Sequence, residues 1–218
     1  MRAILRGAAV AIVPLTVVLA VKLDAADRKI AAAPPFSAHD LTQLPQRDWI
    51  TNGGNIFNQR YSPLTLLNRG NVKDLKALWR TSMGSGASPS NSGQAQILHY
   101  EGTLYVINGA NDVFALDVDS GAILWTYHGN PDPRADVPMG KSSRGVAIGE
   151  GKVFVPLLDA RLVALDQKTG KVAWEVVAET WQKGFSLKSA PLYYNGLVIV
   201  GFTGGEMASR GKVKAFRA

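Results

Sequence analysis

The stretch Ala115-Leu116-Asp117-Val118-Asp119-Ser120-Gly121-Ala122-Ile123-Leu124-Trp125 recurs 49 residues later as Ala164-Leu165-Asp166-Gln167-Lys168-Thr169-Gly170-Lys171-Val172-Ala173-Trp174. Each copy has the form of a strand end, an Asp-x-x-Ser/Thr-Gly turn and a following strand that carries a tryptophan. The Asp side chain can accept hydrogen bonds from the turn backbone, and Gly can take the positive φ that such a hairpin needs. The pattern therefore predicts two copies of one β-hairpin.

A second element recurs in the same register. Gly102-Thr103-Leu104-Tyr105-Val106 returns 49 residues later as Gly151-Lys152-Val153-Phe154-Val155, and 45 residues further on as Gly196-Leu197-Val198-Ile199-Val200. An earlier Trp79 precedes Trp125 by 46 residues. A period of about 40–50 residues with several strands per unit is typical of a β-propeller, whose blades stack radially. We expect the repeated tryptophans to pack between blades.

The rest of the chain supports an all-β fold. Short apolar runs alternate with Gly, Asn and Asp, and only residues 71–78 show a weak helical period. The chain holds two full repeats and a third that runs to Ala218, whereas known propellers have about four blades or more. We therefore expect a partial β-propeller of about three blades, with edge strands open to pairing with other chains.

The N-terminal segment is predicted to direct export. Arg2 and Arg6 precede an apolar run over residues 7–21, which is typical of a secretory signal and short for a membrane span of about 20 residues. Asp24-Ala25-Ala26 offers small residues but no Ala-x-Ala cleavage site, so an uncleaved membrane anchor helix remains the alternative. We assign residues 1–26 to a signal peptide or membrane anchor, 27–47 to a linker and N-terminal arm, and 48–218 to the propeller, in a periplasmic protein.

Composition excludes other classes. The 218 residues are 46% hydrophobic and 19% charged, as in an ordinary soluble protein. Most of the net charge of +7 lies at the two ends of the chain, so no clustered basic face is left for nucleic acid. The chain has no cysteine, which excludes disulfides and thiol nucleophiles.

Four motifs and the tryptophan repeats together resemble one enzyme family. The motifs are Asp48-Trp49-Ile50, Asn58-Gln59-Arg60-Tyr61-Ser62-Pro63-Leu64, Asn71-Val72-Lys73-Asp74-Leu75 and Thr203-Gly204-Gly205-Glu206. They resemble the quinoprotein alcohol dehydrogenases, eight-bladed propellers that hold pyrroloquinoline quinone (PQQ) and a Ca²⁺ or lanthanide ion on their axis. The resemblance spans residues 48–218 and implies oxidation of an alcohol to an aldehyde by hydride transfer to PQQ, with cytochrome c as an electron acceptor.

The resemblance also implies roles for individual residues. Glu206 corresponds to the family's metal ligand, which suits a hard cation, and Thr203, Gly204 and Gly205 correspond to its cofactor contacts. Arg144 matches the arginine that pairs with a PQQ carboxylate, for which a planar guanidinium is well shaped. Gln94 falls where the family usually has a Glu near the cofactor, so it keeps hydrogen bonding and loses the charge.

Other positions depart from the family. Lys188 occupies the place of a cofactor-contacting Thr, where it could pair with a carboxylate or obstruct the site. Pro138-Met139 occupies the place of two adjacent cysteines that form a disulfide ring against the quinone. The family's catalytic base and remaining metal ligands come from later blades, so no catalytic residue is assigned and the chain alone is expected not to turn over. Two alternatives stay open: a non-catalytic repeat scaffold for protein interactions, and a degenerate fragment.

Overall fold

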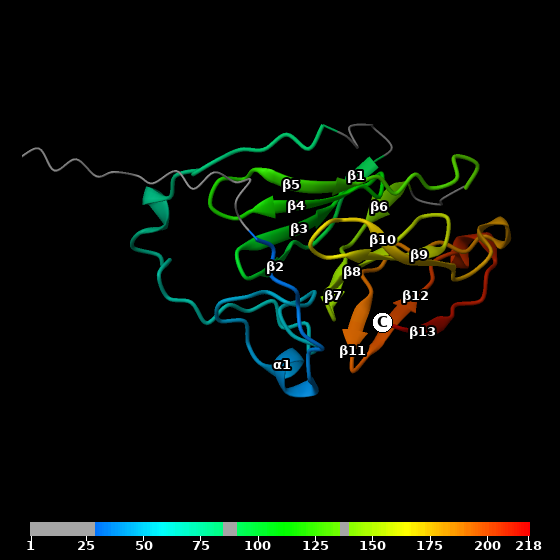
Figure 1. The fold of residues 1–218 in the computed structure, drawn as a ribbon, viewed down its shortest axis with the longest axis horizontal. Coiled ribbons are helices and arrows are strands. Elements are labelled where there is room, and N and C mark those ends of the chain that lie inside the picture. Colours follow the sequence, from blue (N-terminus) through cyan, green and yellow to red (C-terminus); the bar gives the residue numbers. More distant parts are fainter. Residues whose placement is uncertain (1–28, 85–90, 136–139) are drawn as a thin grey trace, which may run out of the picture.

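The computed structural model describes residues 29–84, 91–135 and 140–218. The predicted signal or anchor segment and Pro138-Met139 lie outside these ranges. Three antiparallel sheets follow one another along the chain (Figure 1). The first blade contains β2 (Leu98–Tyr100), β3 (Thr103–Ile107), β4 (Val113–Asp117) and β5 (Ile123–Tyr127), and the second contains β7 (Ala147–Gly149), β8 (Lys152–Pro156), β9 (Arg161–Asp166) and β10 (Val172–Val177). The third contains β11 (Leu192–Tyr194), β12 (Leu197–Gly201) and β13 (Val213–Arg217).

Shorter elements connect these sheets. Strands β1 (Asn91–Gly93) and β6 (Lys141–Ser143) pair in parallel with each other. The helical turns are α1 (Ala38–Thr42), η2 (Val72–Asp74), η3 (Trp181–Lys183) and η4 (Gly205–Met207). The weak helical period of residues 71–78 thus corresponds to one short 3₁₀ turn. No helix within the described residues is long and apolar enough to cross a membrane.

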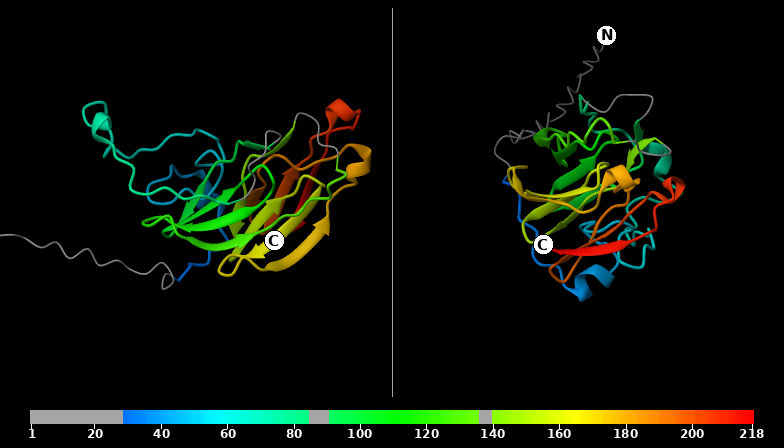
Figure 2. Two further views of the ribbon diagram at one scale, coloured as in Figure 1. Left: turned by 90° about the horizontal axis from the view of Figure 1, so that it is seen from above. Right: turned by 90° about the vertical axis from the view of Figure 1, so that its right-hand side faces the viewer.

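The three sheets are stacked in chain order, as Figure 2 shows from two further directions. Apolar residues of β3, β8, β9 and β12 form the core, and Phe154 is fully buried within it. The ring of Phe154 stacks on that of Tyr193 from the third blade, with centroids 6.0 Å apart. Gly149 belongs to this contact, because a Cβ there would lie 2.8 Å from the Tyr193 ring. The predicted all-β fold, a partial propeller of three blades, is confirmed.

The repeated turns have the predicted chemistry. Asp117 Oδ1 accepts hydrogen bonds from the backbone N–H of Ser120 at 2.8 Å, and Asp166 Oδ1 accepts one from Thr169 N–H at 2.9 Å. The side chain of Thr169 also donates to this carboxylate and holds the pKa of Asp166 below its usual value. Gly170 closes its turn at a positive φ of 68°, a conformation open to glycine at little cost.

Tryptophan side chains connect successive repeats. Trp125 Nε1 donates to the backbone oxygen of Gln167 at 3.0 Å, and its ring covers Gly170 so closely that a Cβ there would lie 2.7 Å away. Trp79 makes the equivalent bond one repeat earlier, to the backbone oxygen of Val118 at 2.9 Å. Each of these two tryptophans therefore docks on the Asp-Gly turn of the following repeat, and for Trp125 of β5 this confirms packing between two blades.

The N-terminal segment packs against the blades. Ala33 N–H donates to Gln167 Oε1 at 2.6 Å, and the backbone N–H of Gly151 donates to Ala33 O at 2.7 Å. Phe36 is buried and meets the edge of the Tyr100 ring. The described part of residues 27–47, expected from its Ala-Pro composition to be a linker and arm, is thus a packed arm.

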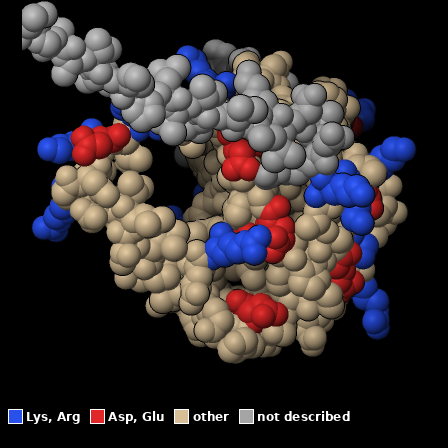
Figure 3. Space-filling view, turned by 60° about the vertical axis from the view of Figure 1, so that its left-hand side comes forward, with Lys and Arg blue, Asp and Glu red and all other residues tan. Residues whose placement is uncertain are grey.

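The described surface carries charges of both signs. Figure 3 shows basic and acidic side chains interspersed over one face. The segment between Ile56 and Leu78 differs, because many of its apolar side chains are exposed, including Leu66 at 82% and Leu78 at 89%.

Candidate functional site

Three segments that lead into the first strands of the blades lie side by side. Strands β1 and β6 pair in parallel with Ser92 opposite Ser142. Between the second and third blades, the backbone N–H of Arg144 donates to the backbone oxygen of Lys188 at 2.9 Å. The backbone at Gln94, Arg144 and Lys188 therefore follows one rim, although these residues are distant in sequence.

Gln94 and Arg144 line the same hollow, which has a volume of about 490 Å³. Both side chains are exposed. Arg60 and the amide side chains of Asn52 and Gln96 also line the hollow, whereas its lining includes no carboxylate and no imidazole. Two guanidinium groups among several amides suit an anionic ligand.

A polar loop brings Arg60 to this hollow. Gly53 N–H donates to Gln96 Oε1 at 2.7 Å, and Asn52 Nδ2 donates to the backbone oxygen of Val146 at 2.9 Å. Arg60 N–H closes the loop on Gly53 O at 2.8 Å. Arg60 belongs to one of the motifs that resemble the family, but the sequence alone did not predict it as a site residue. Its basic charge in a polar loop was the available signal, and its proximity to Arg144 depends on tertiary contacts.

The segment from Thr203 to Glu206 lines a second hollow, of about 500 Å³. Thr203 pairs with Ser186 through two backbone hydrogen bonds, and its side chain donates to Ser186 O at 3.1 Å. Gly204 has φ 134°, and a Cβ there would lie 2.1 Å from the backbone oxygen of Gly184. Only glycine fits at this position, which turns the chain into η4 and leaves the Glu206 side chain exposed.

Lys188 lies between the two groups of predicted residues. It is buried, with 7% of its surface exposed, and Nζ donates to the backbone oxygen of Gly140 at 2.8 Å. Burial lowers the pKa of Lys188, the carboxylate of Glu206 opposes that shift, and the guanidinium of Arg144 adds to it. The predicted residues thus line two hollows, with Lys188 within electrostatic reach of both.

The donor groups fit an anionic cofactor with carboxylates. The hydroxyl groups of Ser143 and Ser186 are buried without a hydrogen-bond partner, and such groups call for an explanation such as a bound ligand. Each lies close in sequence to a cation, Arg144 or Lys188. For a metal, the described residues offer less, because they contain no group of three or more His, Cys, Asp or Glu side chains that could hold an ion. Glu206 is the one carboxylate in the linings of these two hollows.

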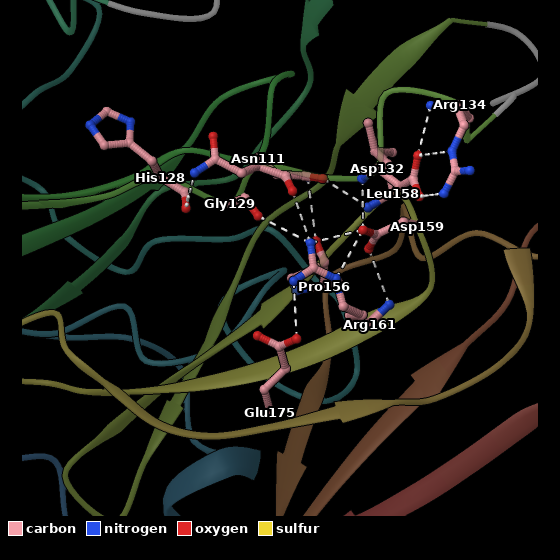
Figure 4. A network of polar contacts seen from close by, with 11 residues as sticks. Asn111, His128, Gly129, Asp132, Arg134, Pro156, Leu158, Asp159, Arg161 and Glu175 are labelled. Carbon is pink, nitrogen blue, oxygen red and sulfur yellow. Dashed lines mark hydrogen bonds and ion pairs between the residues drawn. The ribbon is translucent and has the colours of Figure 1, made fainter.

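A third polar cluster lies away from these hollows, where the first blade meets the second (Figure 4). Arg161 binds Asp159 at 2.8 Å and Glu175 at 3.0 Å, and it donates to the backbone oxygen of Asn130 at 3.0 Å. Asp159 also accepts from the backbone N–H of Asp132 at 2.9 Å. The charges of Arg161 and Asp159 are therefore paired with other protein groups, which indicates that this cluster has a structural role.

The chain is similar in sequence to known proteins. Residues 49–218 match the PQQ family described as glucose/ethanol/alcohol dehydrogenase, β-propeller domain. The chain is 39% identical over 192 residues to the quinoprotein alcohol dehydrogenase PedH of Pseudomonas putida, covering 85% of this chain and 31% of that protein. It is 37% identical over 178 residues to 1-butanol dehydrogenase (cytochrome c) of Thauera butanivorans, covering 78% of this chain and 24% of that protein.

Solved structures agree with the sequence relatives. The chain superimposes on a europium-containing methanol dehydrogenase with a TM-score of 0.74 and 33% identity, covering 83% of this chain and 31% of that one. The quinohemoprotein alcohol dehydrogenase of Comamonas testosteroni also gives a TM-score of 0.74, with 31% identity, 83% of this chain and 27% of that one covered. The chain therefore spans about a quarter to a third of the length of these relatives.

Proposed function

Since this chain belongs to the PQQ family of glucose, ethanol and alcohol dehydrogenase β-propellers, we propose that it forms the N-terminal part of a PQQ-dependent alcohol dehydrogenase. The single observation that carries the proposal is the hollow in which the guanidinium groups of Arg60 and Arg144 lie among several amide side chains, with no carboxylate in the lining. When bound, PQQ supplies the hydride acceptor for oxidation of an alcohol to an aldehyde. The residues of this chain bind and orient it.

Arg144 holds a carboxylate of the cofactor in this proposal. Its guanidinium lines a hollow free of acidic side chains, so no protein carboxylate in the lining competes for its donors. A fork of N–H groups fixes the orientation of a planar carboxylate better than a single ammonium does. Gln94, in the same hollow, donates or accepts a hydrogen bond without adding charge.

Thr203, Gly204, Gly205 and Glu206 contribute the other side of the site. The close backbone approach at Gly204 keeps this loop thin enough to lie against a flat ring system. Glu206 provides one oxygen ligand to a Ca²⁺ or lanthanide ion, which requires further oxygen ligands. We assign no catalytic base, because apart from Glu206 neither hollow has a carboxylate or an imidazole in its lining.

The wider setting is also proposed from the relatives and the N-terminal sequence. One similar protein is named a 1-butanol dehydrogenase (cytochrome c), which supports a small alcohol as substrate and cytochrome c as electron acceptor. Residues 1–26 support export to the periplasm, with membrane anchoring if the segment is not cleaved.

The first prediction is that the full chain binds PQQ in the presence of Ca²⁺. Binding to the folded state alone raises the free energy of unfolding by about 2.7 kcal/mol at a ligand concentration of 100 Kd. We expect a shift in quinone absorbance and a higher melting temperature. Arg144→Met should weaken binding about tenfold or more, since it removes a charge-assisted pair.

Arg47→Met is the matched control, because Arg47 is an exposed arginine that binds Glu101 at 2.6 Å and lines neither hollow. It should leave PQQ binding unchanged. Unchanged absorbance and unchanged melting temperature on titration of the unmodified chain would contradict the proposed function and favour a non-catalytic scaffold.

A further inference from the structure

We propose that this chain self-associates by strand addition, in which residues 76–82 of one copy pair with the free edge of β13 in a second copy. Each contact completes the third blade of one chain with a strand from the other. The inference goes beyond the proposed function and does not depend on PQQ. It rests on two features of the described residues, a strand-like segment without a sheet and a sheet without its outer strand.

Residues 76–82 occupy the place of an outer blade strand. In the first blade, Trp125 lies in the outer strand β5 and docks on the turn that contains Gly170. Trp79 precedes Trp125 by 46 residues and docks in the same way on the turn that contains Gly121. However, residues 76–82 form no strand, and their backbone groups make no hydrogen bond with another described segment. They therefore lack the three inner strands to which β5 is attached.

The exposure of Leu78 agrees with a missing sheet. Leu78 is 89% exposed, whereas Leu124, which stands before the tryptophan of β5 as Leu78 stands before Trp79, is partly buried against the core. The same position of the repeat is thus packed where the strand has a sheet and exposed where it has none. An extended segment of this kind can add to an open sheet edge, where backbone hydrogen bonds supply affinity.

The third blade offers such an edge. Its sheet has the order β11-β12-β13, whereas each of the other two blades has a fourth strand beyond the strand that corresponds to β13. The N–H of Ala218 donates to Gly196 O on the β12 side. Because hydrogen bonds alternate along an antiparallel strand, the backbone groups of Val213, Ala215 and Arg217 point away from β12. Within the described residues, no strand pairs with that side of β13.

A conserved spacing within the repeats gives the register of the pairing. Ala115 stands opposite Trp125 in the first blade, and Ala164 stands opposite Trp174 in the second. Ala215 holds the same position in the third blade, since all three alanines pair with the third residue of the preceding strand. Ala215 is exposed, so the seat opposite it is open for a tryptophan.

Trp79 of the second copy fills this seat. A small side chain at Ala215 leaves room for the indole ring, as in the two complete blades. The same alignment places Arg80 opposite Lys214, which is a pair of like charges and opposes the contact. Glu179 lies 3.1 Å from Lys214, and this ion pair reduces the repulsion.

Association also covers an apolar face of the third blade. Tyr194, Leu197 and Val213 are 36%, 39% and 74% exposed, and their register places them on one face of the sheet. Tyr193 on the opposite face stacks against the second blade, so the exposed face points away from it. The Trp79 segment rests on the first blade of its own chain, and strand addition therefore brings that blade against this face.

Analytical ultracentrifugation of the chain by itself provides the first test. The mass should rise with protein concentration, because each copy has both surfaces and such head-to-tail contacts form closed rings or open chains. A chain that stays monomeric up to about 1 mM, where even weak contacts are populated, would overturn the proposal.

Two variants at exposed positions test the surfaces separately. Leu78→Ser should weaken self-association about tenfold or more, because it removes apolar burial. Leu66→Ser is its control, since Leu66 is 82% exposed but lies outside residues 76–82, and it should associate normally. Equal weakening by both would indicate non-specific apolar association and overturn the proposal.

Ala215→Phe should also weaken self-association about tenfold or more, because its ring occupies the seat of the tryptophan. Ala173→Phe adds the same bulk at an exposed alanine of β10, in a blade that has four strands, and should associate normally. Unchanged association of Ala215→Phe would contradict the register.

Cross-linking identifies the surfaces in contact. The unmodified chain has no cysteine, so Ser82→Cys and Val213→Cys each introduce one thiol at an exposed position. A short bis-maleimide should join the two variants in a mixture, because Ser82 follows the residue that the alignment places opposite Val213. Efficient links within Val213→Cys alone would show that β13 pairs with itself, which overturns the proposal. These outcomes do not depend on PQQ, so they leave the proposed function to its own test.

Discussion

Tyr105 lies where the first blade meets the second, with its ring fully buried beside that of Trp125. Its hydroxyl oxygen accepts a hydrogen bond from Gln167 Nε2 at 2.9 Å. Gln167 is also fully buried, and its other side-chain atom accepts from the N–H of Ala33. One glutamine in the repeated turn therefore connects the N-terminal arm and two blades, and its polar atoms depend on Tyr105.

The ionisation of Tyr105 gives a prediction at the residue scale. Burial raises the pKa of Tyr105 to about 12 from its ordinary value of 10.0. The folded state therefore resists ionisation of Tyr105. The contribution of Tyr105 to the free energy of unfolding is fully present below pH 10 and is lost as pH rises towards about 12. Tyr105→Phe should remove this part of the alkaline loss, while costing about 1–3 kcal/mol at pH 7 through the unpaired Gln167.

Urea unfolding at pH 7 and pH 11 measures both effects. Tyr194→Phe is the control, because Tyr194 is 36% exposed and the variant should show the alkaline loss of the unmodified chain. Equal alkaline loss in Tyr105→Phe and Tyr194→Phe would contradict the role of Tyr105.

The turn and the tryptophan that covers it form the repeating element of the fold. Gly170 has a positive φ and lies in close contact with the ring of Trp125. Alanine would strain the backbone at this φ, and its Cβ would clash with the ring. Gly170→Ala should destabilise the chain by about 1–2 kcal/mol from the left-handed backbone alone. Displacement of Trp125 adds to this cost, and it should shift the tryptophan fluorescence of the folded chain.

Gly201→Ala is the matched control for Gly170→Ala. Gly201 lies in β12, and no atom is within 4 Å of a Cβ built there. Thermal melting of Gly201→Ala should resemble that of the unmodified chain, with a change within about 0.5 kcal/mol. An equal loss of stability in Gly170→Ala and Gly201→Ala would contradict a stabilising role for the contact between the turn and Trp125.

Arg161 acts at the scale of the whole molecule, because it joins the chain leaving the first blade to the second blade (Figure 4). The carboxylate of Asp159 is 4% exposed and lies 2.8 Å from the guanidinium. Arg161→Met would leave this buried charge without its cation, which costs about 3–5 kcal/mol. Urea unfolding should therefore show a large loss of stability, together with loosening of the connection at Asn130.

Arg134→Met is the comparison for this prediction. Arg134 binds Asp132 at 2.8 Å, but its side chain is 78% exposed, and exposed pairs contribute about 0–1 kcal/mol. The two variants each remove an arginine from neighbouring ion pairs, but Arg161 is more buried and also binds Glu175 and the backbone oxygen of Asn130. Similar stability losses in both would contradict the inter-blade role of Arg161.

Local chemistry explains why so much of the fold was predictable from residues alone. The Asp-x-x-Ser/Thr-Gly turn is specified by side chains that bond to backbone groups within a few residues. The 49-residue spacing of Trp125 and Trp174 gives the length of the repeat. The candidate site was less predictable. Gln94 and Arg144 do share a hollow, but Glu206 lines another, and Arg60 was not assigned to the site at all.

By itself, the sequence determined the all-β repeat, the turn conformations and the docking of Trp125 on the next repeat, because hydrogen bonds and φ preferences act over short separations. Tertiary structure alone decided that Arg144 and Lys188 share a rim, that Lys188 is a buried residue and that the Ala-Pro segment before Phe36 packs as an arm. These features join residues of different blades, and only the stacking of the sheets brings such residues together.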